Sequence, residues 1–98
     1  MKISLFCNAG MSTSLVASKL KKAYLERGIT YDVEAFDFSA LQEEADETDV
    51  IILGPQIAWA FDDVTKDYPD KKVIQLTMAE FGSMDGEKVL ERVEKELN

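Results

Sequence analysis

The sequence predicts an α/β fold: a single domain over residues 1–98 with a four-stranded parallel sheet, strand order 2-1-3-4, doubly wound by helices. Four short β-prone segments alternate with segments whose apolar residues recur at helical spacing, which is typical of a parallel sheet with right-handed crossovers. Residues 50–53 are apolar at every position, as expected for a central strand covered on both faces. The length of 98 residues and the 46% hydrophobic content suit one domain with one core.

The first half of this pattern is a strand, a helix and a second strand. Residues 3–6 are β-prone, and the apolar residues of 15–24 recur at helical spacing. Gly28 is expected to end this helix, because glycine is favoured just beyond helix C-termini. Residues 31–36 then alternate between apolar and polar, which indicates the second strand.

Helices are expected on either side of the last two strands. Ser39 and Gln42 have the spacing of a capping box, so a short helix is expected to open there. Another helix is predicted over about 57–67, after the third strand. A fourth strand is predicted over 73–76, and the apolar face of 89–97 predicts the last helix.

The charge of the chain argues against some partners. The formal net charge is −8, whereas general nucleic-acid binding and binding to anionic membranes both need a basic surface. Residues 1–25 nevertheless contain lysines and no acidic residue. An anionic ligand is therefore expected to meet the N-terminal quarter of the chain.

The composition also excludes several kinds of chemistry. The sequence contains no histidine, which excludes Ser-His and Cys-His catalysis and histidine metal ligation within this chain. Cys7 is the single cysteine, so an internal disulfide, a Cys-x-x-Cys redox pair and a Cys-rich zinc site are excluded, and a reducing compartment fits. No apolar stretch approaches the roughly 20 residues of a membrane span. We therefore expect a protein without a metal site.

The predicted site lies where the strand order reverses, between the first and third strands. Ligands of doubly wound sheets bind there, beyond the carboxyl ends of the strands. The loop at this place consists of Cys7, Asn8, Ala9, Gly10, Met11, Ser12, Thr13 and Ser14, and the turn beside it of Gly54, Pro55 and Gln56.

The loop 7–14 has the chemistry of an anion cradle around a nucleophile. A helix N-terminus leaves N–H groups unpaired, and Gly10 allows the backbone to turn so that they converge. The hydroxyls of 12–14 add further donors, and the dipoles at the helix start favour a thiolate at Cys7. These residues leave one alternative open, an inert buried cysteine beside a serine-capped turn.

Two families have loops similar to this one. In low-molecular-weight tyrosine phosphatases the cysteine is followed six positions later by arginine and then Ser or Thr; here Thr13 replaces the arginine and Ser14 fits. The enzyme IIB component of the phosphoenolpyruvate-dependent sugar phosphotransferase system (PTS), lactose/cellobiose/chitobiose class, resembles the chain more closely and over nearly its whole length. Segments 7–14 (CNAGMSTS) and 53–58 (LGPQIA) resemble its two motifs. Asn8 and Trp59 stand where Ser and Tyr are expected.

The PTS resemblance implies a flavodoxin-like or low-molecular-weight-phosphatase-like fold and an enzyme, a phosphotransferase acting through phosphocysteine. It implies that Cys7 accepts a phosphoryl group from a phosphohistidine of enzyme IIA and passes it to a sugar on the membrane enzyme IIC, a β-linked disaccharide such as cellobiose or chitobiose. Residues 8–14 would bind the phosphoryl group. The implied protein is a cytoplasmic monomer, peripheral to the membrane through IIC, without cofactor, nucleic acid or membrane insertion.

Under the PTS resemblance, Thr13 would distinguish a carrier from a phosphatase. An arginine clamp on the phosphoryl oxygens can be worth roughly 10³ to 10⁵ in rate, so its absence leaves attack by water poorly assisted, as a carrier requires. A Cys-dependent phosphatase-like enzyme remains an alternative that Thr13 weakens. An FMN-binding module is another, because a Ser/Thr-rich loop after the first strand can hold a flavin phosphate. Trp59 is expected to pack on its helix rather than to stack on a flavin.

Overall fold

A four-stranded parallel sheet in the order β2-β1-β3-β4 forms the centre of the molecule. The computed structural model describes residues 1–8 and 10–98, without the side chains of 10–12. The predicted fold class and strand order are confirmed. The strands are β1 (Lys2–Cys7), β2 (Asp32–Asp37), β3 (Val50–Leu53) and β4 (Lys72–Gln75).

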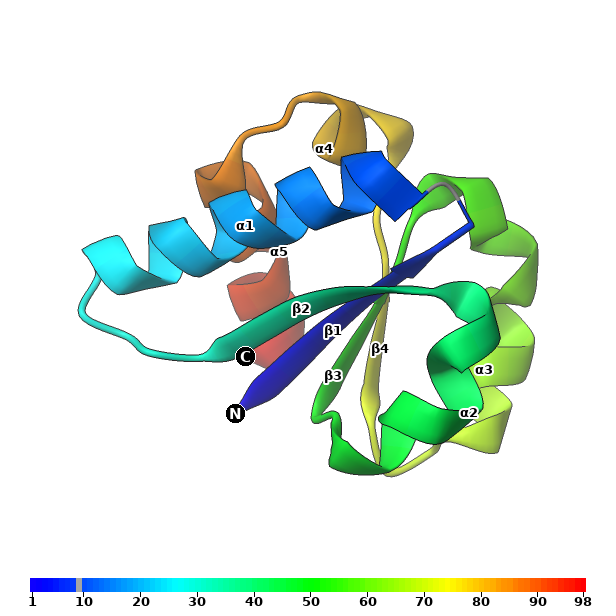
Figure 1. Ribbon diagram of the computed structural model, residues 1–98. Helices are drawn as coiled ribbons and strands as arrows, with labels where there is room; N and C mark the ends of the chain where they lie inside the picture. The colour runs from blue at the N-terminus through cyan, green and yellow to red at the C-terminus, as the bar shows by residue number, and fades with distance from the viewer. Residues whose placement is uncertain (9) are drawn as a thin grey trace.

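Helices cover both faces of the sheet (Figure 1). Helices α1 and α5 lie on one face, and α2 and α3 lie on the other. Within the described residues, no helix is long and apolar enough to cross a membrane. The α-helices are α1 (Gly10–Glu26), α2 (Leu41–Glu44), α3 (Phe61–Asp67), α4 (Met78–Gly82) and α5 (Gly86–Leu97), and the 3-10 turns are η1 (Phe38–Ala40), η2 (Ala45–Glu47) and η3 (Pro55–Ala60).

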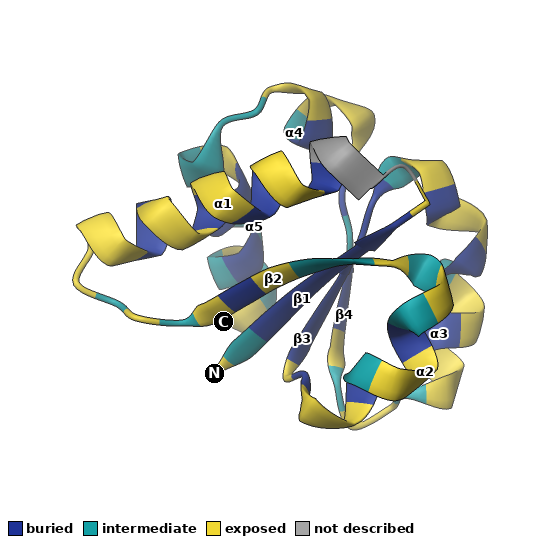
Figure 2. Cartoon of the chain, viewed as in Figure 1, coloured by how far each residue is buried: buried dark blue, intermediate teal, exposed yellow. Residues whose placement is uncertain are grey.

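Side chains of β3 contribute to two separate cores, one on each face of the sheet. Val50 and Ile52 pack with α1 and α5, whereas Ile51 and Leu53 pack with α2 and α3. Successive strand residues point to opposite faces, so a strand covered on both sides is apolar throughout. Figure 2 shows β3 buried along its length. The prediction of a central strand over 50–53 is confirmed.

The cap after β2 differs from the prediction. Asp37, not Ser39, is the cap: its carboxylate accepts hydrogen bonds from the Ser39 backbone N–H at 3.0 Å and from the Ser39 hydroxyl at 2.6 Å. The helical segment therefore begins with η1, and the expected capping box at Ser39 and Gln42 is wrong. A true capping box, which the sequence analysis missed, pairs Thr77 with Glu80 at the start of α4.

The segment after β3 is not one helix. It begins as η3 directly after Gly54, has non-helical dihedrals at Ile57 (φ −120°, ψ 31°), and becomes α-helical only from Phe61. Burial of Ile57 in the second core accompanies this kink. Trp59 consequently remains 73% exposed, and its ring is in a T-shaped arrangement with that of Phe38, at a centroid distance of 5.8 Å. The expectation that Trp59 packs on its helix is wrong.

Candidate functional site

Cys7 is the last residue of β1, at the point where the strand order reverses. β1 pairs with β2 on one side and with β3 on the other, and α1 begins nearby at Gly10. The first residue after β3, Gly54, donates its backbone N–H to the Phe6 carbonyl at 2.9 Å. The two segments that the sequence analysis singled out are therefore neighbours at the carboxyl edge of the sheet (Figure 1).

The thiol of Cys7 is enclosed and hydrogen-bonded. Cys7 is 0% exposed, and its Sγ donates to Gln56 Oε1 at 3.1 Å. The other acceptor near the sulfur, Asn8 Oδ1, lies at 4.0 Å. The single thiol hydrogen points to one acceptor, so Gln56 is the principal partner. Gln56 is itself exposed, and its side chain forms part of the cover over the sulfur.

Gly54 provides the space that the sulfur occupies. A Cβ on this residue would lie 3.0 Å from Cys7 Sγ and 3.0 Å from Gln56 Oε1. Its φ of −68° and ψ of 158° are open to any residue. Glycine is therefore required here for the close approach of the sulfur and not for the backbone conformation.

The predicted loop is described in part. Ala9 lies outside the described residues, and the roles predicted for Gly10, Met11 and Ser12 depend on side chains or placements that also lie outside them. Thr13 is only 1% exposed, and its Oγ1 has no hydrogen-bond partner among the described residues. The helix starts earlier than expected, so Thr13 lies in the first turns of α1 instead of in a loop.

Asn8 and Ser14 are both exposed residues on either side of this helix start. Asp37, the last residue of β2, lies in register with Cys7. Hydrogen bonds from Ser39 hold the pKa of Asp37 below its usual value. This carboxylate is ionised and engaged with its own loop, so it is unsuited to serve as a general acid.

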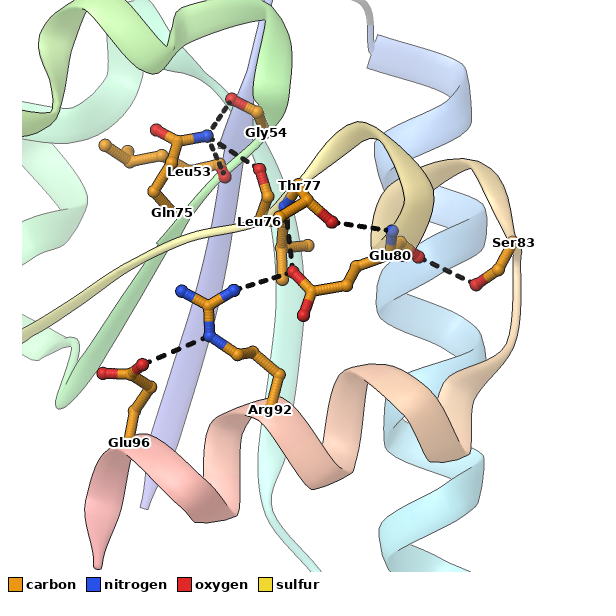
Figure 3. A network of polar contacts seen from close by, with 9 residues as sticks. All are labelled: Leu53, Gly54, Gln75, Leu76, Thr77, Glu80, Ser83, Arg92 and Glu96. Atoms are coloured by element: carbon orange, nitrogen blue, oxygen red, sulfur yellow. Dashed lines mark hydrogen bonds and ion pairs between the residues drawn. The ribbon is translucent and has the colours of Figure 1, made fainter.

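Gln75 is a residue of the site region that the sequence analysis missed. It ends β4 opposite Leu53 of β3, and its side-chain Nε2 donates to the carbonyls of Leu53 (3.2 Å), Gly54 (3.0 Å) and Leu76 (3.0 Å), as Figure 3 shows. A polar residue after the apolar pair Val73-Ile74 of β4 was the only signal in the sequence.

These residues combine a nucleophile with polar groups that can surround an anion. The buried thiol is hydrogen-bonded to an amide and ends the strand that precedes a long helix. The first turns of that helix contain a buried hydroxyl without a hydrogen-bond partner among the described residues. A helix N-terminus favours negative charge, both on a thiolate and on a bound oxyanion. The arrangement is suited to forming a covalent bond to an anionic group and to holding that group afterwards.

Comparisons with known proteins give a consistent result. The family model described as "PTS system, Lactose/Cellobiose specific IIB subunit" matches residues 2–92. The PTS system galactose-specific EIIB component of Lactococcus lactis subsp. cremoris is 36% identical over 98% of this chain and 95% of its own length. The PTS system lactose-specific EIICB component of Lactococcus lactis subsp. lactis is 35% identical over 80% of this chain and 14% of its own length.

Similarity in three dimensions extends over the whole chain. The lactose-specific IIB component domain of the phosphoenolpyruvate:carbohydrate phosphotransferase system from Streptococcus pneumoniae superposes with a TM-score of 0.91. It covers 100% of this chain and 98% of its own, at 15% sequence identity. At that identity the likeness establishes the shared fold.

Proposed function

Because this chain belongs to the lactose/cellobiose-specific IIB family of the PTS, a family of phosphotransferases in sugar transport, we propose that Cys7 is the residue that carries its phosphoryl group. The observation that carries the proposal is the place of Cys7: the only cysteine of the chain ends the central strand β1, directly before the start of α1. The other nucleophilic side chains described at this edge are hydroxyls, which are weaker nucleophiles than a thiol near neutral pH.

The proposed reaction has two transfers. In the first, the Cys7 thiolate attacks the phosphorus of a phosphohistidine on enzyme IIA; the S–P bond forms as the P–N bond breaks, and the imidazole leaves. In the second, a hydroxyl of a sugar bound to enzyme IIC attacks the phosphorus; the O–P bond forms, the S–P bond breaks, and the hydroxyl proton is released. Cys7 returns to the thiolate. The histidine must come from a partner, since this chain has none.

The loop 8–14 is proposed to bind the phosphoryl oxygens. In this proposal Asn8, backbone N–H groups of residues 9–12, and the hydroxyls of 12–14 surround the anion. The buried Thr13 Oγ1 supports it, because a hydroxyl without a hydrogen-bond partner among the described residues is costly unless something else binds it. A phosphoryl oxygen would accept that hydrogen bond.

Gln56 is proposed to follow the state of the sulfur. Its Oε1 accepts the thiol hydrogen at 3.1 Å, but a thiolate or a phosphocysteine has no hydrogen to offer. The exposed amide can then turn and present its NH₂ group to the anion instead. Gly54 and Pro55 connect this side chain to β3. The partner proteins would therefore meet the Gln56 amide in different orientations before and after transfer.

The partners follow from the family. IIB components work between a IIA donor and a IIC acceptor, and the lactose-specific EIICB relative, by its name, joins IIC and IIB in one chain. We propose that this chain is a cytoplasmic monomer that reaches the membrane only through IIC and needs no cofactor. A β-linked disaccharide such as cellobiose or chitobiose is the proposed sugar.

The test is the intact mass after incubation with phosphoenolpyruvate, the general PTS proteins and IIA. Wild type should gain one phosphoryl group, whereas Cys7→Ser should gain none. Ser83→Ala, a change of one side-chain atom at the end of α4, is the matched control and should be phosphorylated like wild type. Phosphate on a Ser, Thr or Asp with Cys7 still free would refute the proposal. Continuous release of inorganic phosphate without sugar would support the phosphatase-like alternative instead.

A further inference from the structure

We propose that Gln75 is a positioning residue for phosphoryl transfer: its side-chain amide holds the turn 54–56 against Cys7. The inference rests on the proposed role of Cys7. Gln75 does not touch the sulfur. It acts through the backbone of Gly54, where an added Cβ would lie only 3.0 Å from the sulfur, and through the turn that carries Gln56.

The side-chain amide of Gln75 donates hydrogen bonds to three carbonyls at the ends of two neighbouring strands. Its Nε2 lies 3.0 Å from the oxygens of Gly54 and Leu76 and 3.2 Å from that of Leu53 (Figure 3). All three carbonyls belong to the ends of β3 and β4, where the ladder of backbone hydrogen bonds stops. The amide thus fastens the end of β3 to β4 at the residue next to the site.

The orientation of this amide is fixed. Turning it over would place Oε1 among three carbonyl oxygens, where it could accept nothing. In the observed orientation Oε1 is buried and has no hydrogen-bond partner within the described residues. An unpaired buried oxygen lowers stability. A buried side chain that makes three hydrogen bonds with one end and leaves the other end unpaired within the described residues is typical of a functional site.

Two donors, one on the same turn and one on β4, hold the carbonyl of Gly54. Its carbonyl accepts from Gln75 Nε2 at 3.0 Å and from the Ile57 backbone N–H at 3.1 Å. Loss of the first donor would leave this carbonyl with one of these two hydrogen bonds. The turn 54–56, which brings Gly54 close to Cys7 Sγ and carries Gln56, would then be held less firmly.

The test compares Gln75→Met with Arg92→Met. Methionine keeps the volume and removes the donor. Arg92 of α5 pairs with Glu80 of α4 (2.8 Å) and with Glu96 of its own helix (3.2 Å), so its replacement removes polar contacts of elements other than β3 and the turn 54–56. Unfolding by urea records the stability of both variants. Single-turnover transfer from phosphorylated IIA gives the rate constant at saturation and the half-saturating IIA concentration.

We expect Gln75→Met to lower the rate constant at saturation by about tenfold to a hundredfold, because small displacements of reacting groups have effects of this order. The half-saturating concentration should stay at the wild-type value, since the Gln75 amide is turned into the protein. Arg92→Met should transfer like wild type. An unchanged rate constant for Gln75→Met, or an equal loss in Arg92→Met at matched stability, would overturn the inference.

A measurement without partners separates this inference from the proposed function. Alkylation of Cys7 by iodoacetamide should be faster in Gln75→Met than in wild type and Arg92→Met, because a loosened turn uncovers the sulfur. If wild type accepts no phosphoryl group, the proposed function fails, and equal alkylation rates in all three proteins then overturn the placement of Gln75 as well. If Gln75→Met does not fold, Gln75→Asn takes its place. Rapid exchange of the Gln75 side-chain amide hydrogens in wild type would also overturn the inference.

Discussion

Replacement of Gly54 by alanine would place a methyl group against the reacting sulfur. The added Cβ would lie 3.0 Å from Cys7 Sγ, whereas non-bonded heavy atoms are in optimal contact at about 3.5–4.0 Å. The two atoms must therefore separate by about 0.5–1 Å. Because the backbone of Gly54 has φ −68°, alanine brings no backbone strain, and the destabilising part of the effect comes from the close contacts of the added Cβ.

The expected cost can be bounded from two opposing terms. Overpacking in a dense core costs about 1–3 kcal/mol, while a Gly→Ala change without strain stabilises by about 0.4–1 kcal/mol through the unfolded state. The free energy of unfolding should therefore fall by about 0–2.6 kcal/mol, and each kcal/mol lost corresponds to about 4–8 °C in Tm for a chain of this size. Displacement of the sulfur should slow phosphoryl transfer by at least about tenfold.

A double-mutant cycle with Cys7→Ala isolates the contact. Without the sulfur, Gly54→Ala should cost clearly less than in wild type. Of the two close atoms that remain, Gln56 Oε1 ends a flexible exposed side chain, and the Cβ at position 7 lies at 3.3 Å, where a shift of a few tenths of an ångström relieves the contact. Gly82→Ala is the control for the unfolded-state term, since a Cβ there meets nothing within 4 Å. Urea unfolding of the four cycle members gives the coupling energy. An equal cost of Gly54→Ala with and without the sulfur would refute the reasoning.

Three further predictions concern polar groups of the fold. Thr13→Val removes a buried hydroxyl that has no hydrogen-bond partner among the described residues, so we expect higher stability but slower phosphorylation. A fall in stability by urea unfolding would contradict this. The Thr48 hydroxyl donates to the Glu44 carbonyl at 2.9 Å, so the Ser4 hydroxyl must donate to Thr48 at 2.7 Å. Thr48→Val should lower the free energy of unfolding by about 1–3 kcal/mol, and by more than Ser4→Ala, because it leaves the buried Ser4 donor without an acceptor. The opposite order would refute the assignment. Burial and the hydrogen bond to Glu94 raise the pKa of Tyr24 above its ordinary value. The contribution of this shift to stability is therefore present below about pH 10 and is lost as the pH rises further. Tyr24→Phe should remove this loss of stability at high pH in urea unfolding, and an unchanged pH profile would contradict the assignment.

The sequence predicted those features that depend on local pattern. The apolar run 50–53 identified the central strand, and the place of Cys7 and Gly54 followed from the strand order. Gln75 could not be found in this way, because its role depends on the parallel register that places it opposite Leu53. The burial of Thr13 likewise depends on α1 beginning as early as Gly10, and the sequence alone did not locate that start.

The predictions of the cap after β2 and of the packing of Trp59 were wrong for a different reason. Asp37 and Ser39 are both good capping residues, and the choice between them depends on where β2 ends. Trp59 is apolar at a helical spacing, but the 3-10 geometry of η3 turns it outward. In both places the tertiary structure selects among local conformations that the sequence makes about equally favourable.

The exposed indole of Trp59 gives the protein an intrinsic optical reporter. It is the only tryptophan of the chain, it is 73% exposed, and it belongs to the same turn, η3, as Gln56. Indole emission shifts to shorter wavelength when water is replaced by protein, so a docking partner that covers this turn would change the fluorescence of a single known residue. Encounters at the Cys7 edge of the sheet could thus be followed in time in the unlabelled protein, with any tryptophan-free partner.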